Sequence, residues 1–140
     1  MPRADFYLID KPRFREQPLL LVCELAKRAF TAQQPLLILT RDFAQAEAID
    51  ELLWSFDEDA FLPHQLAGDD DDASTAILIV PPDIDTPDRP LLINLRESCP
   101  EGRYERVLEV VAADAGERDG SRSRWRDYLQ RGFEVNKFDM

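Results

Sequence analysis

Leu36-Leu37-Ile38-Leu39 follows Pro35 as an unbroken run of four apolar residues. A strand with one face in solvent alternates apolar and polar residues, whereas an unbroken apolar run is typical of a strand buried on both faces. Similar runs return over residues 76–80 and 91–95. These runs predict a mostly parallel sheet with helices on both sides, because burying both faces of a sheet requires two helical layers.

Further elements are expected around these three runs. We expect strands over residues 5–9 and 106–111, and helices over residues 17–33, 42–56 and 115–131. Asp42 is placed to cap the second helix, and Gly132 to end the last one as a left-handed residue. Strands that alternate with helices in this way predict an α/β fold, a three-layer Rossmann-like domain that spans residues 1–140 as one unit.

The composition predicts a folded cytoplasmic protein without a cofactor. Apolar residues make up 44% of the chain, too large a share for a disordered acidic segment. No stretch approaches the roughly 20 apolar residues of a membrane span, and the start lacks the pattern of a signal peptide. Cys23 and Cys99 have no metal-binding spacing and are interpreted as reduced thiols. One histidine, His64, with scattered partners predicts no metal site.

A group of arginines near the end of the chain stands out against a net charge of −11. Five arginines and two aspartates lie between Arg118 and Arg131, which leaves −14 for the rest of the chain. A field of this sign repels a nucleic-acid backbone. We therefore expect no strong direct binding of nucleic acid, and single-stranded DNA binding stays only as a minor alternative.

The spacing of these arginines predicts a binding site on the last helix. Arg118, Arg122 and Arg126 are four residues apart, which places them along one stripe, with Trp125 beside it. Arginine binds carboxylates through a planar fork, and tryptophan offers a flat apolar wall. With Val111 as a floor, such a site suits an acidic peptide that ends in an aromatic residue. A solvated helix face is the alternative interpretation.

A second candidate site is the stretch between Trp54 and Gly68. Its large apolar side chains are Trp54, Phe56, Phe61, Leu62, Pro63 and Leu66. We expect no regular element over residues 61–68, so some of these side chains pack in the core and others form an exposed apolar patch, which usually marks a protein contact. His64 is expected to have a structural or interface role.

Acidic residues provide the runner-up hypothesis, an enzyme. Asp10, Asp83 and Asp85 follow predicted strands, where the active sites of α/β folds lie, and they raise the possibility of a metal-dependent phosphoryl transferase or hydrolase. No glycine-rich phosphate loop accompanies them. Residues 69–72 lack the spacing of a calcium loop and are expected to be a solvated acidic loop.

Six stretches, in a fixed order, carry a resemblance to a known family. They are residues 6–10, 21–26, 50–54, 61–68, 91–95 and 122–133. The most specific feature is Asp50-Glu-Leu-Leu-Trp54 followed by Pro63-His-Gln-Leu-Ala-Gly68. Over essentially its whole length the chain resembles the chi subunit of bacterial DNA polymerase III holoenzyme, a member of the clamp-loader complex.

The resemblance implies a non-enzymatic α/β adaptor with two protein partners. It implies that the acidic C-terminal tail of single-stranded-DNA-binding protein docks on the last helix, at Arg118, Arg122, Trp125 and Arg126, with Val111 as an apolar neighbour. Trp125 stands where the family usually has tyrosine. It also implies that the psi subunit, which links chi to the clamp loader, binds the region of Trp54, Phe61, Pro63, His64 and Leu66.

Overall fold

The computed structural model describes residues 1–57, 59 and 61–140 of the chain. The elements of this part are β1 (Arg3–Leu8), α1 (Pro12–Glu16), α2 (Pro18–Thr31), β2 (Leu36–Leu39), α3 (Phe43–Ser55), β3 (His64–Leu66), the 3-10 turn η1 (Asp72–Ser74), β4 (Ile77–Val80), β5 (Leu91–Asn94), β6 (Arg106–Val111), α4 (Ala115–Gln130) and β7 (Glu134–Asp139). Its strands form one seven-stranded sheet in the order β3-β4-β2-β5-β6-β1-β7, and all neighbouring strands are parallel. The predicted parallel sheet is confirmed.

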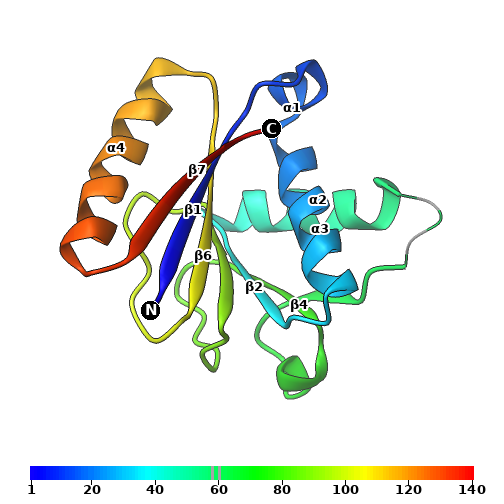
Figure 1. Cartoon of the computed structure of the whole chain (residues 1–140). Helices are drawn as coiled ribbons and strands as arrows, with labels where there is room; N and C mark the ends of the chain where they lie inside the picture. Colours follow the sequence, from blue (N-terminus) through cyan, green and yellow to red (C-terminus); the bar gives the residue numbers. More distant parts are fainter. Residues whose placement is uncertain (58, 60) are drawn as a thin grey trace.

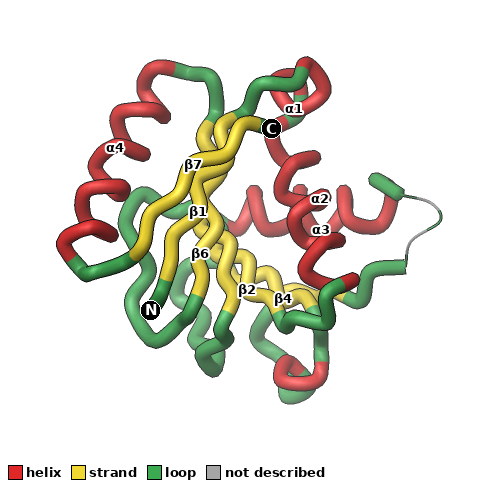
Figure 2. Tube along the Cα trace, in the orientation of Figure 1, coloured by secondary structure: helices red, strands yellow, loops and turns green. Residues whose placement is uncertain are grey.

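The sheet lies between two helical layers. Helices α2 and α3 cover one face and α4 lies on the other, as Figures 1 and 2 show from the same side. Strand β2 contributes to both layers, because Leu36 and Ile38 pack in the core under α2 and α3, while Leu37 and Leu39 pack in the core on the α4 side. All four side chains are buried. The predicted three-layer α/β architecture is confirmed.

The ends of two helices follow the local sequence signals. The side chain of Asp42 accepts a hydrogen bond from the backbone N–H of Gln45 at 2.7 Å and so caps α3. Gly132 follows α4 with a φ of 86°, a left-handed conformation that glycine adopts without strain. Its N–H donates to the carbonyl of Leu129 at 3.1 Å, which ends α4 and turns the chain back towards the sheet.

Besides the short 3-10 turn η1, three elements were not predicted from the sequence, and two of them are edge strands. Strand β3 lies in the stretch expected to be irregular and pairs with β4. Strand β7 follows α4, which was expected to be the last element, and pairs with β1. The third is the short helix α1. An edge strand is covered less than a central one, so neither β3 nor β7 carries the unbroken apolar run that predicts the central strands.

The acidic stretch 69–72 is not wholly solvated, which corrects the expectation. Asp72 is buried and accepts hydrogen bonds from the backbone N–H groups of Gly68 (2.8 Å) and Asp69 (3.3 Å). The bond from Gly68 is the main cause of a lowered pKa at this carboxyl group. Nearby, the buried guanidinium of Arg89 donates to the carbonyl oxygens of Leu36, Asp72, Thr75 and Ala76. Together, Asp72 and Arg89 hold this loop against the starts of β2 and β4.

Candidate functional site

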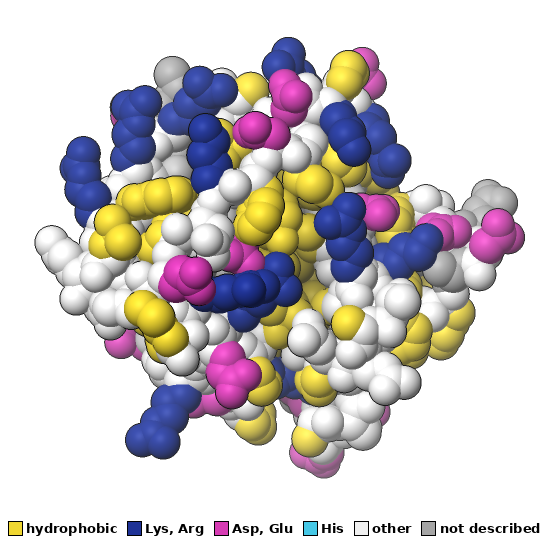
Figure 3. Space-filling view, viewed as in Figure 1, with side chains coloured by type: hydrophobic (Ala, Val, Ile, Leu, Met, Phe, Trp, Pro, Cys, Tyr) yellow, Lys and Arg dark blue, Asp and Glu magenta, His cyan; other side chains and the backbone are white. Residues whose placement is uncertain are grey.

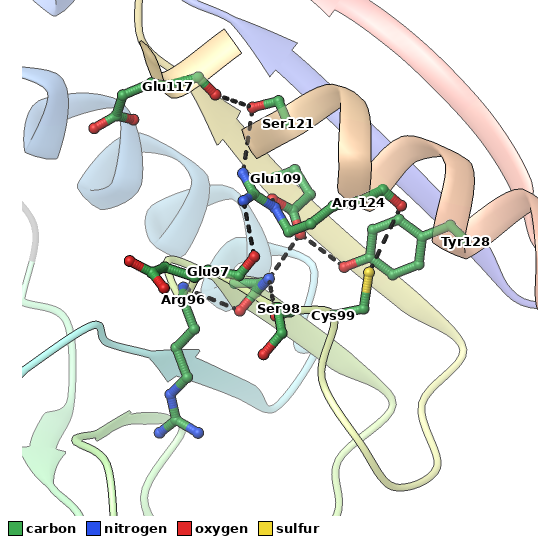
Figure 4. Close-up of polar contacts among 10 residues, drawn as sticks. Arg96, Glu97, Ser98, Cys99, Glu109, Glu117, Ser121, Arg124 and Tyr128 are labelled. Carbon is green, nitrogen blue, oxygen red and sulfur yellow. Dashed lines mark hydrogen bonds and ion pairs between the residues drawn. The ribbon is translucent and has the colours of Figure 1, made fainter. Parts of the chain in front are cut away.

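A buried carboxylate holds α4 on the sheet. Glu109 of β6 is 0% exposed and accepts hydrogen bonds from Arg124 Nε (2.8 Å) and the Tyr128 hydroxyl (2.7 Å), both on α4, and from Asn94 Nδ2 of β5 (2.7 Å). Figure 4 shows Arg124 and Tyr128 converging on Glu109. Burial raises the pKa of Glu109 although the Arg124 guanidinium opposes that shift, and burial also raises the pKa of Tyr128. Because two α4 residues bind one carboxylate, the rotation of the helix about its axis is fixed.

Held in this way, α4 forms one wall of a pocket of about 420 Å³. The apolar floor consists of Phe6 and Leu8 of β1 and Val111 of β6. Trp125 of α4 completes it, with its ring centroid 4.9 Å from that of Phe6. The pocket is therefore a cleft between the helix and the edge of the sheet.

Cationic side chains stand at the rim of this pocket. Arg118 and Arg122 come from α4 and Lys137 from β7, and Figure 3 shows Lys and Arg side chains gathered over α4. Arg122 forms an exposed ion pair with Asp119 at 3.4 Å. The side chains of Arg118 and Lys137 make no hydrogen bond or ion pair with any residue in the described part of the chain. The arrangement places positive charge directly beside an apolar floor.

Most of the residues predicted for the tail site meet at this pocket. The structure brings together Val111, Arg118, Arg122 and Trp125, but Arg126 does not line the pocket and is exposed outside it. The reason is geometric, since an α-helix turns about 100° per residue and a step of four residues therefore leaves a rotation of about 40°. Arg126 is rotated by about 80° from Arg118 and faces away from the sheet.

The two other arginines of this group stabilise the fold. Arg124 forms its ion pair with the buried Glu109 at 2.8 Å. Arg131 pairs with Asp127 at 3.0 Å and donates to the carbonyl oxygen of Pro100 at 3.0 Å. Only part of the charge that stands out in the sequence is therefore available to a ligand.

The second candidate site has an exposed part and a buried part. Trp54 and Phe61 are 60% and 70% exposed, with ring centroids 5.9 Å apart, and we call this pair the aromatic surface. The His64 ring lies 4.7 Å from that of Trp54, but its side chain is 0% exposed. Its ring nitrogens lie 2.6 Å from the Leu62 carbonyl oxygen and 3.1 Å from that of Asp50. His64 therefore supports the aromatic surface from below, and a partner cannot reach it.

Pro63 and Leu66 complete the predicted set around β3. Both are half-buried, and Leu66 packs against the core under α2 and α3. Of the five residues predicted for this interface, Trp54 and Phe61 therefore present the most surface to a partner.

The aspartates of the enzyme hypothesis do not come together. Asp10 follows β1, whereas Asp83 and Asp85 follow β4, and three strands lie between β1 and β4. This separation corresponds to about 19 Å, or four inter-strand spacings. Among the described residues, no group of three or more His, Cys, Asp and Glu side chains is placed to hold a metal ion. A shared metal site of Asp10, Asp83 and Asp85 is therefore wrong.

The environment of the two cysteines and the character of the helices also bear on the class of function. Cys23 and Cys99 are buried, and burial raises the pKa of each thiol to about 12, so neither is activated as a nucleophile. Within the part of the chain that the structure describes, no helix combines the length and the apolar character needed to cross a bilayer.

Of the pocket residues on the sheet, sequence reasoning found Val111 and missed the other three. These are Phe6, Leu8 and Lys137, and Lys137 reaches the pocket because β7 pairs in parallel with β1 and sets Lys137 opposite Phe6. The alternation of apolar and polar residues over residues 133–136 is a weak signal for a strand. Nothing in that alternation indicates which strand it joins.

Comparisons with known proteins identify the family of this chain. A family model described as DNA polymerase III chi subunit, HolC, matches residues 1–136. DNA polymerase III subunit chi of Pseudomonas aeruginosa is 34% identical over 137 residues, which cover 95% of this chain and 93% of that protein. The subunit chi of Escherichia coli is 30% identical over 145 residues, with 97% of each chain covered.

A solved structure supports the fold alone. The C-terminal domain of the DEAD-box protein Dbp5 superimposes with a TM-score of 0.70 and covers 99% of this chain and 90% of its own, at 11% identity. The family match spans nearly the whole chain, and the relatives reach 34% identity over nearly their full length. The chain therefore belongs to the DNA polymerase III chi subunit family.

Proposed function

We propose that residues 1–140 act as one non-catalytic adaptor domain with two protein-binding faces. The pocket beside α4 binds the acidic C-terminal tail of single-stranded-DNA-binding protein, and the aromatic surface binds the psi subunit and so links the chain to the clamp loader. The observation that carries the proposal is the pocket itself, in which an apolar floor lies beside Arg118 and Arg122 in a chain of net charge −11.

The chemistry of this pocket favours an acidic peptide with an apolar end. The floor of Phe6, Leu8, Val111 and Trp125 accepts an aromatic or aliphatic side chain, while the guanidinium groups at the rim accept carboxylates. A long polyanion such as DNA would also meet the acidic remainder of the surface, which repels it. A short tail meets only the pocket.

Binding of the tail is expected to be weak and sensitive to salt. The rim cations are exposed, and exposed ion pairs contribute only about 0–1 kcal/mol each. We therefore expect a Kd in the micromolar range, about −8 kcal/mol. Raising the salt concentration from about 50 mM to about 500 mM should weaken binding about tenfold, because it shortens the range of the rim charges.

Fluorescence anisotropy measures the Kd and its dependence on salt. The purified chain is titrated with a labelled acidic peptide that ends in phenylalanine. The control peptide has the same length and charge but ends in serine, and it should bind more weakly because the floor stays empty. Absence of binding at the lower salt concentration, or equal binding of the two peptides, would contradict the proposal.

The aromatic surface is expected to bind psi independently of the tail. Phe61→Asp places a charge on the most exposed aromatic ring of the described chain, and it should weaken psi binding at least about tenfold, since exposed aromatic residues are frequent interface anchors. The variant should keep the wild-type affinity for the tail peptide, because Phe61 lies outside the tail pocket. Surface plasmon resonance with immobilised psi measures the first effect.

Trp125→Ala is the matched control, as it removes an aromatic side chain from the other face. It should reduce tail binding and leave psi binding unchanged. If Phe61→Asp binds psi as the wild type does, the aromatic surface is not the psi interface.

A further inference from the structure

The tail pocket has a positive charge on the wall opposite α4. Lys137 lies on β7, and the parallel register sets it opposite Phe6, whose side chain belongs to the core on the α4 side of the sheet. Residues opposite each other in a parallel pair point to the same face. Lys137 therefore borders the pocket from the sheet edge, while Arg118 and Arg122 border it from the helix.

This lysine is free to bind a ligand. Its side chain is exposed and makes no hydrogen bond or ion pair with the described residues, whereas Arg122 shares its charge with Asp119 at 3.4 Å. It lies on an edge strand, so no further strand of the described chain covers it. Its ammonium group is a flexible point charge, in contrast to the planar forks of the arginines.

We propose that Lys137 is a ligand-binding residue of this pocket, and that the ligand is clamped between cations on two walls. The inference rests on the proposed function and deepens it. It requires a peptide whose apolar anchor enters the floor while one carboxylate meets the helix side and a different carboxylate meets the sheet side. Arg126, although it continues the arginine stripe, is not part of this clamp because it lies outside the pocket.

The comparison of Lys137→Ala with Arg126→Ala tests whether Lys137 binds the ligand. Each variant removes one positive charge from an exposed position, so the long-range field changes equally and the difference reports the local contact. For a labelled acidic peptide that ends in phenylalanine, we expect Lys137→Ala to raise the Kd about fivefold and Arg126→Ala to raise it less than about twofold. Lys137→Arg, which keeps the charge, should stay within about twofold of the wild type.

A set of peptides locates the two contacts. Each acidic residue of the peptide is replaced in turn by its amide, and each peptide is titrated against the wild type, Lys137→Ala and Arg122→Ala in double-mutant cycles. The clamp predicts that the carboxylate coupled to Lys137 differs from the one coupled to Arg122. A role of Lys137 in stability alone would weaken all peptides equally and would show no coupling.

The results separate this inference from the proposed function. If the wild type fails to bind the peptide, the tail site itself is wrong. The clamp is wrong, and the tail site stands, if the wild type binds the peptide but Arg126→Ala weakens binding as much as Lys137→Ala does. The same conclusion holds if a single peptide carboxylate shows a coupling energy with both Lys137 and Arg122.

Discussion

Replacing Glu109 with alanine is expected to lower the free energy of unfolding by about 3–5 kcal/mol, the usual cost of removing one partner of a buried ion pair. The variant leaves the guanidinium of Arg124 without its carboxylate, and it removes the acceptor of Asn94 Nδ2 and of the Tyr128 hydroxyl. Both α4 residues lose their link to β6. Chemical denaturation followed by circular dichroism measures the change.

Glu47→Ala is the control, because Glu47 is exposed on α3, and it should change the free energy of unfolding by less than about 0.5 kcal/mol. Glu109→Gln keeps the shape and provides a milder variant in case Glu109→Ala does not fold. It should still be clearly less stable than the wild type, since Arg124 loses its counter-charge. A Glu109→Ala variant within about 1 kcal/mol of the wild type would show that the buried network does not hold α4.

Arg122→Glu is expected to abolish most tail binding and to leave the fold intact. The substitution places a carboxylate at the rim of the pocket beside Asp119, so two negative charges then face an acidic ligand. We expect the Kd to rise at least about tenfold, because like charges across an interface are strongly unfavourable. The Arg122 side chain is 69% exposed, so the free energy of unfolding should change by less than about 0.5 kcal/mol.

Isothermal titration calorimetry with the acidic peptide measures this loss of affinity. Arg28→Glu is the matched control, because it makes the same change in net charge on α2, in the helical layer on the other side of the sheet. It should reduce affinity only slightly. Equal losses in the two variants would mean that the peptide senses net charge alone and that the pocket beside α4 is not its site.

The central strands could be predicted from the sequence because burial on both faces leaves a local signal. The bounds of β2 and β6 agree with the prediction, and every residue of β2 is buried. Strand β7 has no such signal, since most of its residues are exposed. Its position depends instead on pairing with β1 and on the hydrogen bond from Asn136 to the buried Asp5 at 3.0 Å, across more than a hundred residues of sequence.

The helix side of the pocket could be predicted because residue spacing along a helix is also a local signal, whereas only Val111 of the sheet side was predicted. Spacing alone placed Arg118, Arg122 and Trp125 on one side of a helix. The same spacing misplaced Arg126, because residues four apart drift around the helix. Lys137 reaches the pocket through strand register, which is a property of the folded sheet and cannot be found in a local pattern.

The place of β1 in the sheet has a consequence for how the chain matures. Residues 3–8 pair only with residues 106–111 and 134–139, so the ribosome completes β1 long before either of its partner strands. Strand β1 therefore stays unpaired until β6 emerges, and an unpaired strand whose side chains are mostly buried in the finished sheet is prone to aggregate. The pocket takes its floor and walls from β1, β6, α4 and β7, so it forms only when these elements have come together. A chain in which β7 has not yet joined β1 lacks Lys137 at the sheet side of this pocket.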